Sequence, residues 1–455
     1  MRIILKSKIL LLLLLVMTAG FRCSFLTPAA KELLEPIELT WWGVVDDAHN
    51  FDAIIGTYRS VHPNVSISYR QLRPEEFEGE LLEALAEDRG PDIFSIHNTW
   101  VTKYISKIQP LPENTTMAYE ITQRSLGIKE ETLVEVRETP SITPAQLRIQ
   151  FIDVVFNDVV RDSKIYGLPL SVDTLALFYN VDLLNNAGIP LPPTTWLGVQ
   201  DNVRKLTQQN RSGELVLSGI AIGSANNVTN GSDVISLLMM QNGADMTQGN
   251  RASFQFVPAG FPDRTYNPGP EAIRFYTDFA NTGKEVYTWD ERFGNSIDAF
   301  AQGTTAMMFG YSRDRATLEA KRQGKLNFGI TPVPQIEGRI AVNFADYWVQ
   351  TVSSKSKNVN AAWDFIQFMS KKDQVRSYLT KTGQPTALRS LIEEQLTDDG
   401  MAVFAQQLLT STSWYRGRQP EIVDGIFSEM IQAVLAGEDA QTAADTAAQK
   451  IDQSL

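Results

Sequence analysis

The chain has 455 residues, of which 43% are hydrophobic and 21% are charged, and its formal net charge at pH 7 is -12. This length suffices for about two domains, and the composition is that of a globular protein with a sizeable buried core. The acidic balance argues against nucleic acid or an anionic lipid surface as the partner, because both require a basic surface. An uncharged or mildly polar ligand fits the charge better.

The N-terminus has the order of a secretory signal peptide. Basic residues at positions 2, 6 and 8 precede an apolar run over residues 9–17, and small residues follow at 18–20. The run is too short for a comfortable membrane span, so we expect the chain to be exported. Residues 1–23 are predicted to be the signal, and residues 24–36 a short tether.

Cys23 is the only cysteine of the chain, which rules out an internal disulfide. Its position just after the apolar run suggests the lipid-modified cysteine of a bacterial lipoprotein. Such a cysteine usually has a large aliphatic residue three positions earlier and a small residue directly before it, whereas this chain has Gly20 and Arg22 there. Simple cleavage near Gly20 and an uncleaved anchor therefore stay open as alternatives.

The region after the tether alternates strands and helices. Apolar and polar residues alternate over 37–41 and 65–69, which predicts two strands, and residues 92–96 indicate a third. Helices are predicted over 47–60 and from Pro74 onward. This order, with its short turns, predicts a parallel sheet covered on both faces, and ligands bind such sheets at the carboxyl ends of the strands. The loops after the first and third strands are therefore candidate binding loops.

The segment 164–196 is the most informative stretch of the sequence. Two apolar runs, 168–170 and 175–179, flank Asp173, which has no neighbouring base to pair with. That carboxylate must therefore face water or a ligand. A short helix is predicted to end at Gly188, and the prolines that follow prevent its continuation. The chain passes here from one structural unit into another.

The remaining regions carry weaker patterns. Residues 112–163 lack clean alternation and are predicted to be mostly helical. Beyond Trp196, the pattern predicts helices near 197–209, 232–241, 270–282 and 358–370, strands at 215–222, 305–309 and 327–333, an extended crossing at 341–352, and two packed helices at the end of the chain.

A set of distinctive stretches runs through the chain in a fixed order. They are LTWWG, VHPNVSISY, GPDIFSIHNTW, IYGLPLSVDTLALFYNVDLLNNAGIPLPPTTW, AFAQGTTAMMFGYSRD, NFGITPVP, SKSKNVNAAWDFIQFM, TGQPTALRS and VLAGEDAQTAADTAAQKI. Together they resemble the extracellular solute-binding proteins of ABC importers, in the maltose-binding-protein-like group that takes sugars and oligosaccharides. The resemblance covers most of residues 37–455. It departs at 343–345, where Asn-Phe-Ala stands in place of the glycine pair usual in the family.

The resemblance implies an α/β, two-lobed periplasmic-binding-protein-like fold. Each lobe is expected to be a mainly parallel sheet flanked by helices, with hinge segments crossing between lobes near 171–174, near 345–350 and between about 378 and 388. The ligand would be trapped in the cleft as the lobes close about the hinge. The expected lobes are residues 37–172 plus about 349–380, and residues 173–345 plus about 385–455.

Candidate ligand-binding residues follow from the chemistry of sugars. Sugar binders stack aromatic rings on the apolar sugar faces and surround the edges with carboxylates, amides and guanidinium groups. The matching family positions favour Asp46, Asp173 and Tyr311 as ligand-binding residues. The aromatic and basic loop 414–418 looks exposed in the sequence. The full set of candidates is Trp42, Asp46, Asn98, Trp100, Asp173, Asn227, Tyr311, Arg313, Tyr347, Trp348, Trp414 and Arg416.

Each candidate also has a structural alternative. Trp42 could pack under the sheet, and Asp46 or its neighbour could cap the helix that follows. Asp173 could hold the hinge through hydrogen bonds to backbone amides. Tyr347 and Trp348 lie on opposite faces of one extended segment, so we expect one in the core and the other in the cleft.

A secreted glycosidase or other hydrolase is the rival class, because carboxylates and aromatic rings also line those clefts. The sequence has no G-x-S-x-G or H-E-x-x-H motif and no phosphate-binding loop, and its histidines at 49, 62 and 97 lack the spacing of a zinc site. We therefore expect no enzyme activity, no metal and no cofactor, although motifs alone leave a paired-carboxylate mechanism open.

The expected function is a binding equilibrium in which the exported protein, as a monomer, captures a sugar and delivers it to a membrane permease. The energy for transport would come from a separate cytoplasmic ATPase. A non-sugar solute stays open as the ligand. Carboxylates facing one another would favour a polyamine and clustered basic residues a phosphate ester, and a peptide is a third alternative.

Overall fold

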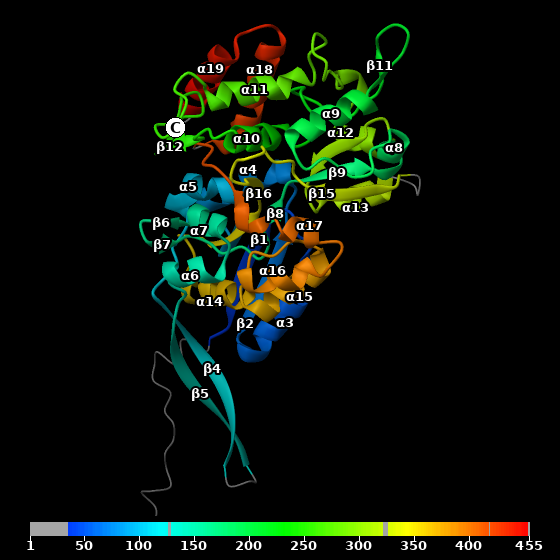
Figure 1. Ribbon diagram of the computed structural model, residues 1–455. Coiled ribbons are helices and arrows are strands. Elements are labelled where there is room, and N and C mark those ends of the chain that lie inside the picture. The colour runs from blue at the N-terminus through cyan, green and yellow to red at the C-terminus, as the bar shows by residue number, and fades with distance from the viewer. Residues whose placement is uncertain (1–34, 126–128, 322–325, 418, 454–455) are drawn as a thin grey trace, which may run out of the picture.

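A computed structural model describes residues 35–125, 129–321, 326–417 and 419–453, which form two lobes, one above the other in Figure 1. The predicted signal peptide, Cys23 and most of the predicted tether lie outside these residues. Within the described ranges, no helix combines the length and apolarity needed to cross a membrane.

The first lobe contains a four-stranded sheet in the order β17-β3-β1-β2. The three predicted strands are confirmed and run parallel, and β17 joins β3 antiparallel. Leu39 and Trp41 on one face of β1 are fully buried. Pro74 opens the second helix, as predicted, with acidic residues in its first turn. The elements are β1 (Ile37–Gly43), α3 (Asp52–Val61), β2 (Val65–Gln71), α4 (Pro74–Ala86), β3 (Ile93–His97), α5 (Val101–Tyr104) and β17 (Trp348–Val352), with the short 3-10 helices η1 (Ala48–Asn50), η2 (Asn98–Trp100) and η3 (Ile105–Lys107).

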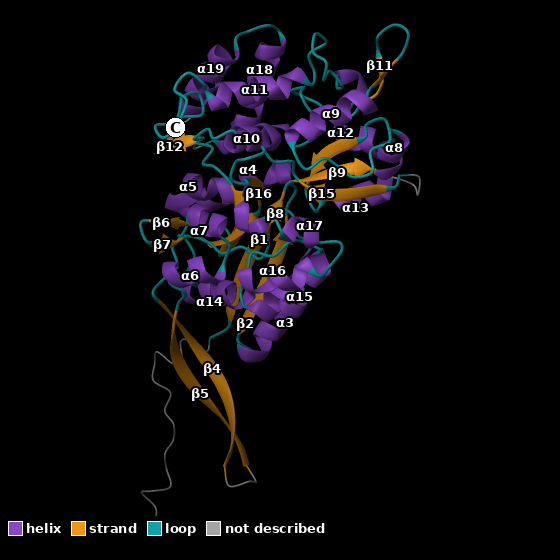
Figure 2. Ribbon diagram, in the orientation of Figure 1, coloured by secondary structure: helices purple, strands orange, loops and turns teal. Residues whose placement is uncertain are grey.

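Further helices complete the first lobe. Their apolar faces join one buried cluster with the sheet, so helices cover the sheet as Figure 2 shows. They are α6 (Pro144–Gln150), α7 (Asp153–Val159), α14 (Val359–Met369), α15 (Lys372–Thr382) and α16 (Arg389–Leu396), with a small ribbon of β6 (Val160–Arg161) and β7 (Lys164–Ile165).

A long hairpin projects from the first lobe, at the bottom of Figure 1. It consists of β4 (Asn114–Ser125) and β5 (Lys129–Pro140), paired antiparallel from Asn114 with Pro140 to Ser125 with Lys129. The prediction that 112–163 is mostly helical is therefore wrong for its first half and right only for α6 and α7. Residues 135–140 of β5 are all exposed, so no burial pattern marks the strand in the sequence.

The second lobe contains a three-stranded sheet in the order β14-β9-β15. Both outer strands pair antiparallel with β9, whereas a mainly parallel sheet was expected in both lobes. The reason is that β9 leads away from the hinge while β14 and β15 return to it, so that Gly310 and Pro332 both lie opposite Ala176. The strands are β9 (Ala176–Asn180), β10 (Gln208–Gln209), β11 (Leu215–Leu217), β12 (Thr247–Gln248), β13 (Arg251–Ala252), β14 (Met307–Gly310) and β15 (Phe328–Pro332).

Helices surround this sheet and make up most of the second lobe (Figure 2). The short helix before Gly188 is confirmed, and Gly188 has a φ of 70°, which favours glycine. The two closing helices are also confirmed. The helices are α8 (Val181–Asn186), α9 (Trp196–Leu206), α10 (Gly231–Gln241), α11 (Pro268–Asp278), η4 (Glu291–Phe293), α12 (Ser296–Ala301), α13 (Asp314–Lys321), α18 (Pro420–Leu435) and α19 (Ala440–Gln453).

Short strands join the lobes. β8 (Asp173–Thr174) pairs antiparallel with β16 (Asn343–Asp346), which also pairs with β18 (Ser411–Thr412). Val172 packs in the first core and Leu175 in the second, whereas Phe344 packs in the second and Ala345 in the first. The chain therefore changes lobes at β8 and at β16.

The last change of lobe comes later than expected. A crossing was expected between about 378 and 388, but α15 and α16 both pack into the first core. The segment 384–388 stays beside 168–172, because Val172 N–H donates to Pro385 O at 3.1 Å and Ser171 bridges Thr386. The chain reaches the second lobe only beyond α16, through α17 (Ala402–Ala405) and η5 (Leu408–Thr410).

Candidate functional site

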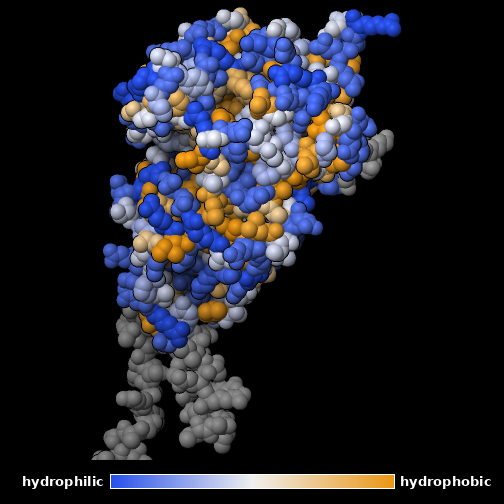
Figure 3. Space-filling model, in the orientation of Figure 1, coloured by the Kyte–Doolittle hydropathy of each residue, from blue (hydrophilic) through white to orange (hydrophobic). Residues whose placement is uncertain are grey.

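Two adjoining cavities lie where the lobes meet. The smaller has a volume of roughly 290 Å³ and the larger roughly 580 Å³. His97, Asp346 and Trp348 line both cavities and so form the wall between them. The smaller cavity is also lined by Asp46, Ser171, Asp173, Arg313, Gln350, Tyr378 and Gln384, and the larger by Trp100, Asn226, Asp233, Arg416 and Asp424. On the face shown in Figure 3, apolar and hydrophilic residues mix along this junction.

Asp346 ties the two lobes together at the centre of the site. His97, at the end of β3, donates from Nε2 to one carboxylate oxygen, and Arg313 of the second lobe donates to the other. Burial alone would raise the pKa of Asp346, but Arg313 and His97 outweigh it and hold this pKa well below its ordinary value. The ion pair with Arg313 and the hydrogen bond from His97 therefore keep Asp346 charged, and the ion pair spans the hinge.

Asp173 lies opposite Asp346 in the β8–β16 pair. Its carboxylate accepts hydrogen bonds from Ser312 N–H at 3.1 Å, from Ser312 Oγ at 2.7 Å and from Thr174 N–H at 2.9 Å. Burial raises the pKa of Asp173 to about 6, although Arg313 and Ser312 act in the opposite direction. The hinge role foreseen for this residue is therefore present. Contact with a ligand stays a prediction, supported by its place on the cavity wall.

The sequence left two roles open for Asp46 and Asp47, a cap on the following helix and a place in the binding site. Asp47 Oδ1 accepts from His49 N–H at 2.9 Å and so caps the short helix η1. Asp46 instead lines the smaller cavity and accepts from the Tyr378 hydroxyl at 2.9 Å. Burial raises the pKa of Asp46, against the hydrogen bond from Tyr378.

An aromatic wall borders the larger cavity. Trp100 and Trp348 are both partly exposed, with ring centroids 6.0 Å apart, and Trp100 stacks on Tyr104. Tyr347 is buried, and its hydroxyl donates to Asp158 at 2.7 Å. Both residues line the smaller cavity, but this hydrogen bond holds Tyr347 against the first lobe, whereas Trp348 is partly exposed and also lines the larger cavity.

The second lobe supplies a charged wall. Asp233, on α10, accepts from the Tyr311 hydroxyl at 2.8 Å and from the guanidinium of Arg416. Arg416 also donates to Asp424 at 3.2 Å, and its Nε is buried without a hydrogen-bond partner. Tyr311 is 0% exposed and lines neither cavity, so it does not present a ring to a ligand as the resemblance implied. The loop after β14 places this ring in the core of the second lobe, where its hydroxyl donates to Asp233.

Four further candidates lie away from the two cavities. Trp42 is half-buried, with the Arg70 guanidinium 4.9 Å from its ring centre. Asn98 is buried and donates to Asp158 at 2.8 Å, and Asn227 donates to a backbone carbonyl at 3.0 Å. Trp414 is 5% exposed and stacks on Phe427, so the loop that looks exposed in the sequence is buried at this residue. Its ring borders a separate hollow.

Sequence reasoning missed several residues of the site. Asp346 is the most central of them, and its signal was the one that singled out Asp173, namely a carboxylate within an extended apolar crossing. Asp233, Tyr378 and Gln384 sit on helices or turns with no distinctive pattern around them. They reach the cavities only because the chain folds back from distant positions.

Comparison with known proteins places the chain in a family. A family model described as bacterial extracellular solute-binding protein matches residues 53–405. The chain belongs to this family. The matched segment includes both hinge strands β8 and β16 and most of the residues that line the cavities.

Individual relatives are distant. The chain is 24% identical to the maltodextrin-binding protein of Bacillus subtilis (strain 168) over 318 residues, which cover 67% of this chain and 70% of the relative. It is 24% identical to the galactooligosaccharide-binding protein of the same organism over 247 residues, 54% of each chain, so this match spans about half of the relative's length.

Solved structures share the fold. The cyclic alpha-maltosyl-1,6-maltose binding protein from Arthrobacter globiformis superposes with a TM-score of 0.69 at 20% identity, covering 92% of this chain and 99% of that one. The sugar-binding protein MalE from Xanthomonas citri gives a TM-score of 0.68 at 18% identity, covering 91% and 96%. These likenesses confirm the two-lobed α/β fold.

Proposed function

We propose that this protein is the exported ligand-capturing component of an ABC importer, which binds a sugar or oligosaccharide between its lobes and delivers it to a membrane permease. The observation that carries the proposal is the pair of adjoining cavities, lined by side chains of both lobes. Membership of the solute-binding family supports it. The names of its relatives and structural neighbours, which refer to galactooligosaccharide, maltodextrin and a cyclic maltosyl-maltose, point to the same ligand class.

The chemistry of the walls suits a carbohydrate. Trp100 and Trp348 offer apolar faces for the C–H surface of a sugar ring. Asp46, Asp173 and Gln350 offer acceptors and donors for ring hydroxyls in the smaller cavity. Cavities of roughly 290 and 580 Å³ that share a wall give room for more than a single small solute, which favours an oligosaccharide.

The mechanism is a shift between open and closed forms. A ligand that touches both walls binds the closed form more tightly, and this difference in affinity shifts the population toward closure. A permease with a separate cytoplasmic ATPase would recognise the closed shape. We propose that the protein acts as a monomer, makes and breaks no covalent bond in its ligand, and is held at the membrane by a lipid on Cys23.

A thermal-shift screen tests the ligand class. Maltose, maltotetraose and galacto-oligosaccharides are compared with spermidine and glycerol phosphate, because a ligand that binds only the native state raises the melting temperature. We expect an oligosaccharide to raise it by several degrees, an effect that Trp348→Ala abolishes. A rise with spermidine or glycerol phosphate alone, and none with any sugar, would contradict the proposal.

A cationic solute is the second candidate, because carboxylates predominate among the charged groups around the cavities. Asp46, Asp173 and Asp346 line the smaller cavity with one arginine, and Asp233 and Asp424 line the larger with another. Three of these five carboxylates, however, already pair with Arg313 or Arg416. The sugar therefore remains the first choice, and spermidine in the screen decides between them.

A further inference from the structure

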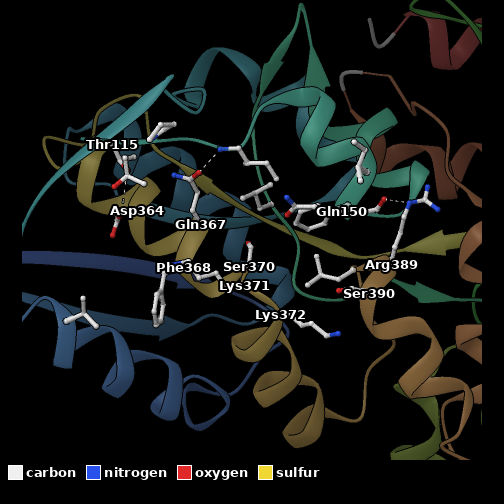
Figure 4. A pocket seen from close by; sticks show the side chains of 18 of the residues that line it. Thr115, Gln150, Asp364, Gln367, Phe368, Ser370, Lys371, Lys372, Arg389 and Ser390 are labelled. Carbon is white, nitrogen blue, oxygen red and sulfur yellow. Dashed lines mark hydrogen bonds between the residues drawn. The ribbon is translucent and has the colours of Figure 1, made fainter. Parts of the chain in front are cut away.

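A larger hollow lies on the first lobe, outside the site between the lobes. This groove has a volume of roughly 900 Å³. Its walls come from the base of the β4–β5 hairpin, the end of α3, the α6–α7 junction, α14 and the starts of α15 and α16. Figure 4 shows Asp364, Gln367 and Phe368 on one side of it and Arg389 on the other. Since His62 lies three residues before the first residue of β2, this wall of the groove lies at the amino-terminal end of the sheet, and the interlobe cavities lie at the carboxyl end.

Buried polar groups form one end of the groove. Asp364 accepts from the Tyr58 hydroxyl at 2.9 Å, and His62 Nε2 lies 3.4 Å from the same oxygen. His62 is 2% exposed, and burial lowers its pKa against the pull of Asp364, so it adds no positive charge at neutral pH. Tyr119, at the hairpin base, packs with its ring centre 4.6 Å from that of His62.

Apolar side chains and cations line the rest of the groove. Phe151, Phe368 and Ile149 supply apolar lining, and Ile149 is 74% exposed. Arg389 is fixed by a hydrogen bond to Phe151 O at 2.7 Å and an ion pair with Asp153. The ammonium group of Lys371 lies 5.3 Å from the Phe368 ring centre.

The groove is lined by more cations than carboxylates, although the chain as a whole is acidic. Lys371, Lys372 and Arg389 line it together with a single carboxylate, Asp364, on a protein with a formal charge of -12. Neither lysine forms an ion pair with a carboxylate within the described part of the chain. A concave apolar surface with a few convergent polar groups is the usual form of a small-molecule site.

We propose that this groove binds an amphipathic organic anion, with an aromatic or aliphatic body over Phe368, Ile149 and Phe151 and a carboxylate, sulfonate or phosphate against Lys371 and Lys372. All of its lining residues belong to the first lobe and none lines the interlobe cavities. Binding here therefore does not depend on the proposed carbohydrate ligand, and the two proposals fail separately.

The test is a fluorescence titration of the full exported chain with anilinonaphthalene sulfonate, an aromatic sulfonate that serves as the probe. We expect saturable binding to one site. Lys371→Glu combined with Lys372→Glu should weaken this binding about tenfold or more, because it reverses two charges beside the sulfonate. Ile149→Asp should weaken it several-fold, and the exposure of this side chain means that the variant keeps its fold.

Matched controls locate the probe. Lys205→Glu with Lys357→Glu makes the same change in net charge at exposed lysines outside the three cavities. Ile340→Asp makes the same change as Ile149→Asp at a side chain that is 88% exposed and lines none of them. We expect both controls, and Trp348→Ala in the interlobe wall, to bind the probe within about twofold of the parent chain. Absence of saturable binding, or equal losses in the groove variants and their controls, would overturn the proposal.

Discussion

Buried carboxylates define the chemistry of the site between the lobes. Asp173 and Asp346 face each other on neighbouring strands, an arrangement that costs free energy unless cations or hydrogen-bond donors compensate. Arg313 and His97 compensate Asp346, and Ser312 compensates Asp173. The two residues consequently have opposite shifts in pKa, downward for Asp346 and upward for Asp173.

The raised pKa of Asp173 predicts a pH-dependent stability. Its folded-state value of about 6 lies above the unfolded value of about 3.9, so the folded protein binds the extra proton between these values. The free energy of unfolding contributed by this group therefore falls as pH rises from about 4 to 6, by at most about 3 kcal/mol. Asp173→Asn removes this titration.

Urea unfolding of the parent chain and Asp173→Asn at a series of pH values from 4 to 7 measures the effect. We expect the variant to gain stability relative to the parent as pH rises through this window, and no further change above it. A difference between the two proteins that does not vary with pH would contradict the assignment.

Tyr311 is expected to support the fold and not to stack on the ligand. Tyr311→Phe leaves the buried Asp233 oxygen without its donor, which should lower the free energy of unfolding by about 1 to 3 kcal/mol. Tyr166→Phe is the control, because the hydroxyl of this tyrosine, which is 9% exposed, makes no hydrogen bond to any described residue. If Tyr311→Phe lost affinity for the cleft ligand while keeping its stability, the ring would face the cleft instead.

Single residues of the site were predictable only where a local pattern marked them. Asp173 stood out because it interrupts two apolar runs, and Asp46 because it follows a strand that ends at the cleft. The burial of Tyr311 and Trp414 depends on partners far away in the sequence, Asp233 and Phe427. No local pattern could have shown these contacts.

The alternating strands and helices of the first lobe could be predicted from the sequence, whereas the projecting hairpin could not. β1 and β2 each have one more deeply buried face, so their periodicity reports burial, whereas β3 is a short apolar strand that is buried on both faces. In β4 the neighbouring residues Met117 and Ala118 are both buried, and the described side chains at the end of β5 are all exposed, so neither strand shows a clean alternation. A strand that projects from the domain packs against no core, so its apolar residues need not recur at every second position.

The hairpin should be dispensable for binding in the cleft. We predict that replacing residues 121–133 with Asn-Gly leaves the affinity for the cleft ligand within about twofold, because the cut keeps Met117 and Ala118, which pack on the first lobe. Titration calorimetry with the ligand found in the screen measures this. A larger loss of affinity, with an unchanged melting temperature, would show that the hairpin takes part in binding.

The whole molecule consists of two lobes joined at β8 and β16, with charged contacts across the junction. Arg313 belongs to the second lobe and pairs with Asp346 beside His97 of the first. Removing this arginine should favour the open form, because the pair exists only when the lobes hold this arrangement.

We predict that Arg313→Met raises the radius of gyration of the ligand-free protein in X-ray scattering and weakens cleft binding by about fivefold, the magnitude of a partly exposed ion pair. Arg204→Met is a close control, because this arginine is 41% exposed in its side chain, against 40% for Arg313, and both of its ion-pair partners, Asp201 and Glu285, lie in its own lobe. Equal scattering and affinity for both variants would mean that the Arg313 pair does not hold the lobes.

Carbohydrate binding between the lobes is tested by titration calorimetry of the parent chain and Trp348→Ala with the oligosaccharide identified by thermal shift, starting from maltotetraose. Trp348 lines both interlobe cavities, and loss of a central aromatic ring costs about 2 kcal/mol or more of binding free energy. We predict one site per chain in the parent and an affinity at least about thirtyfold weaker in the variant. Equal affinities would place the carbohydrate outside the cleft and contradict the account.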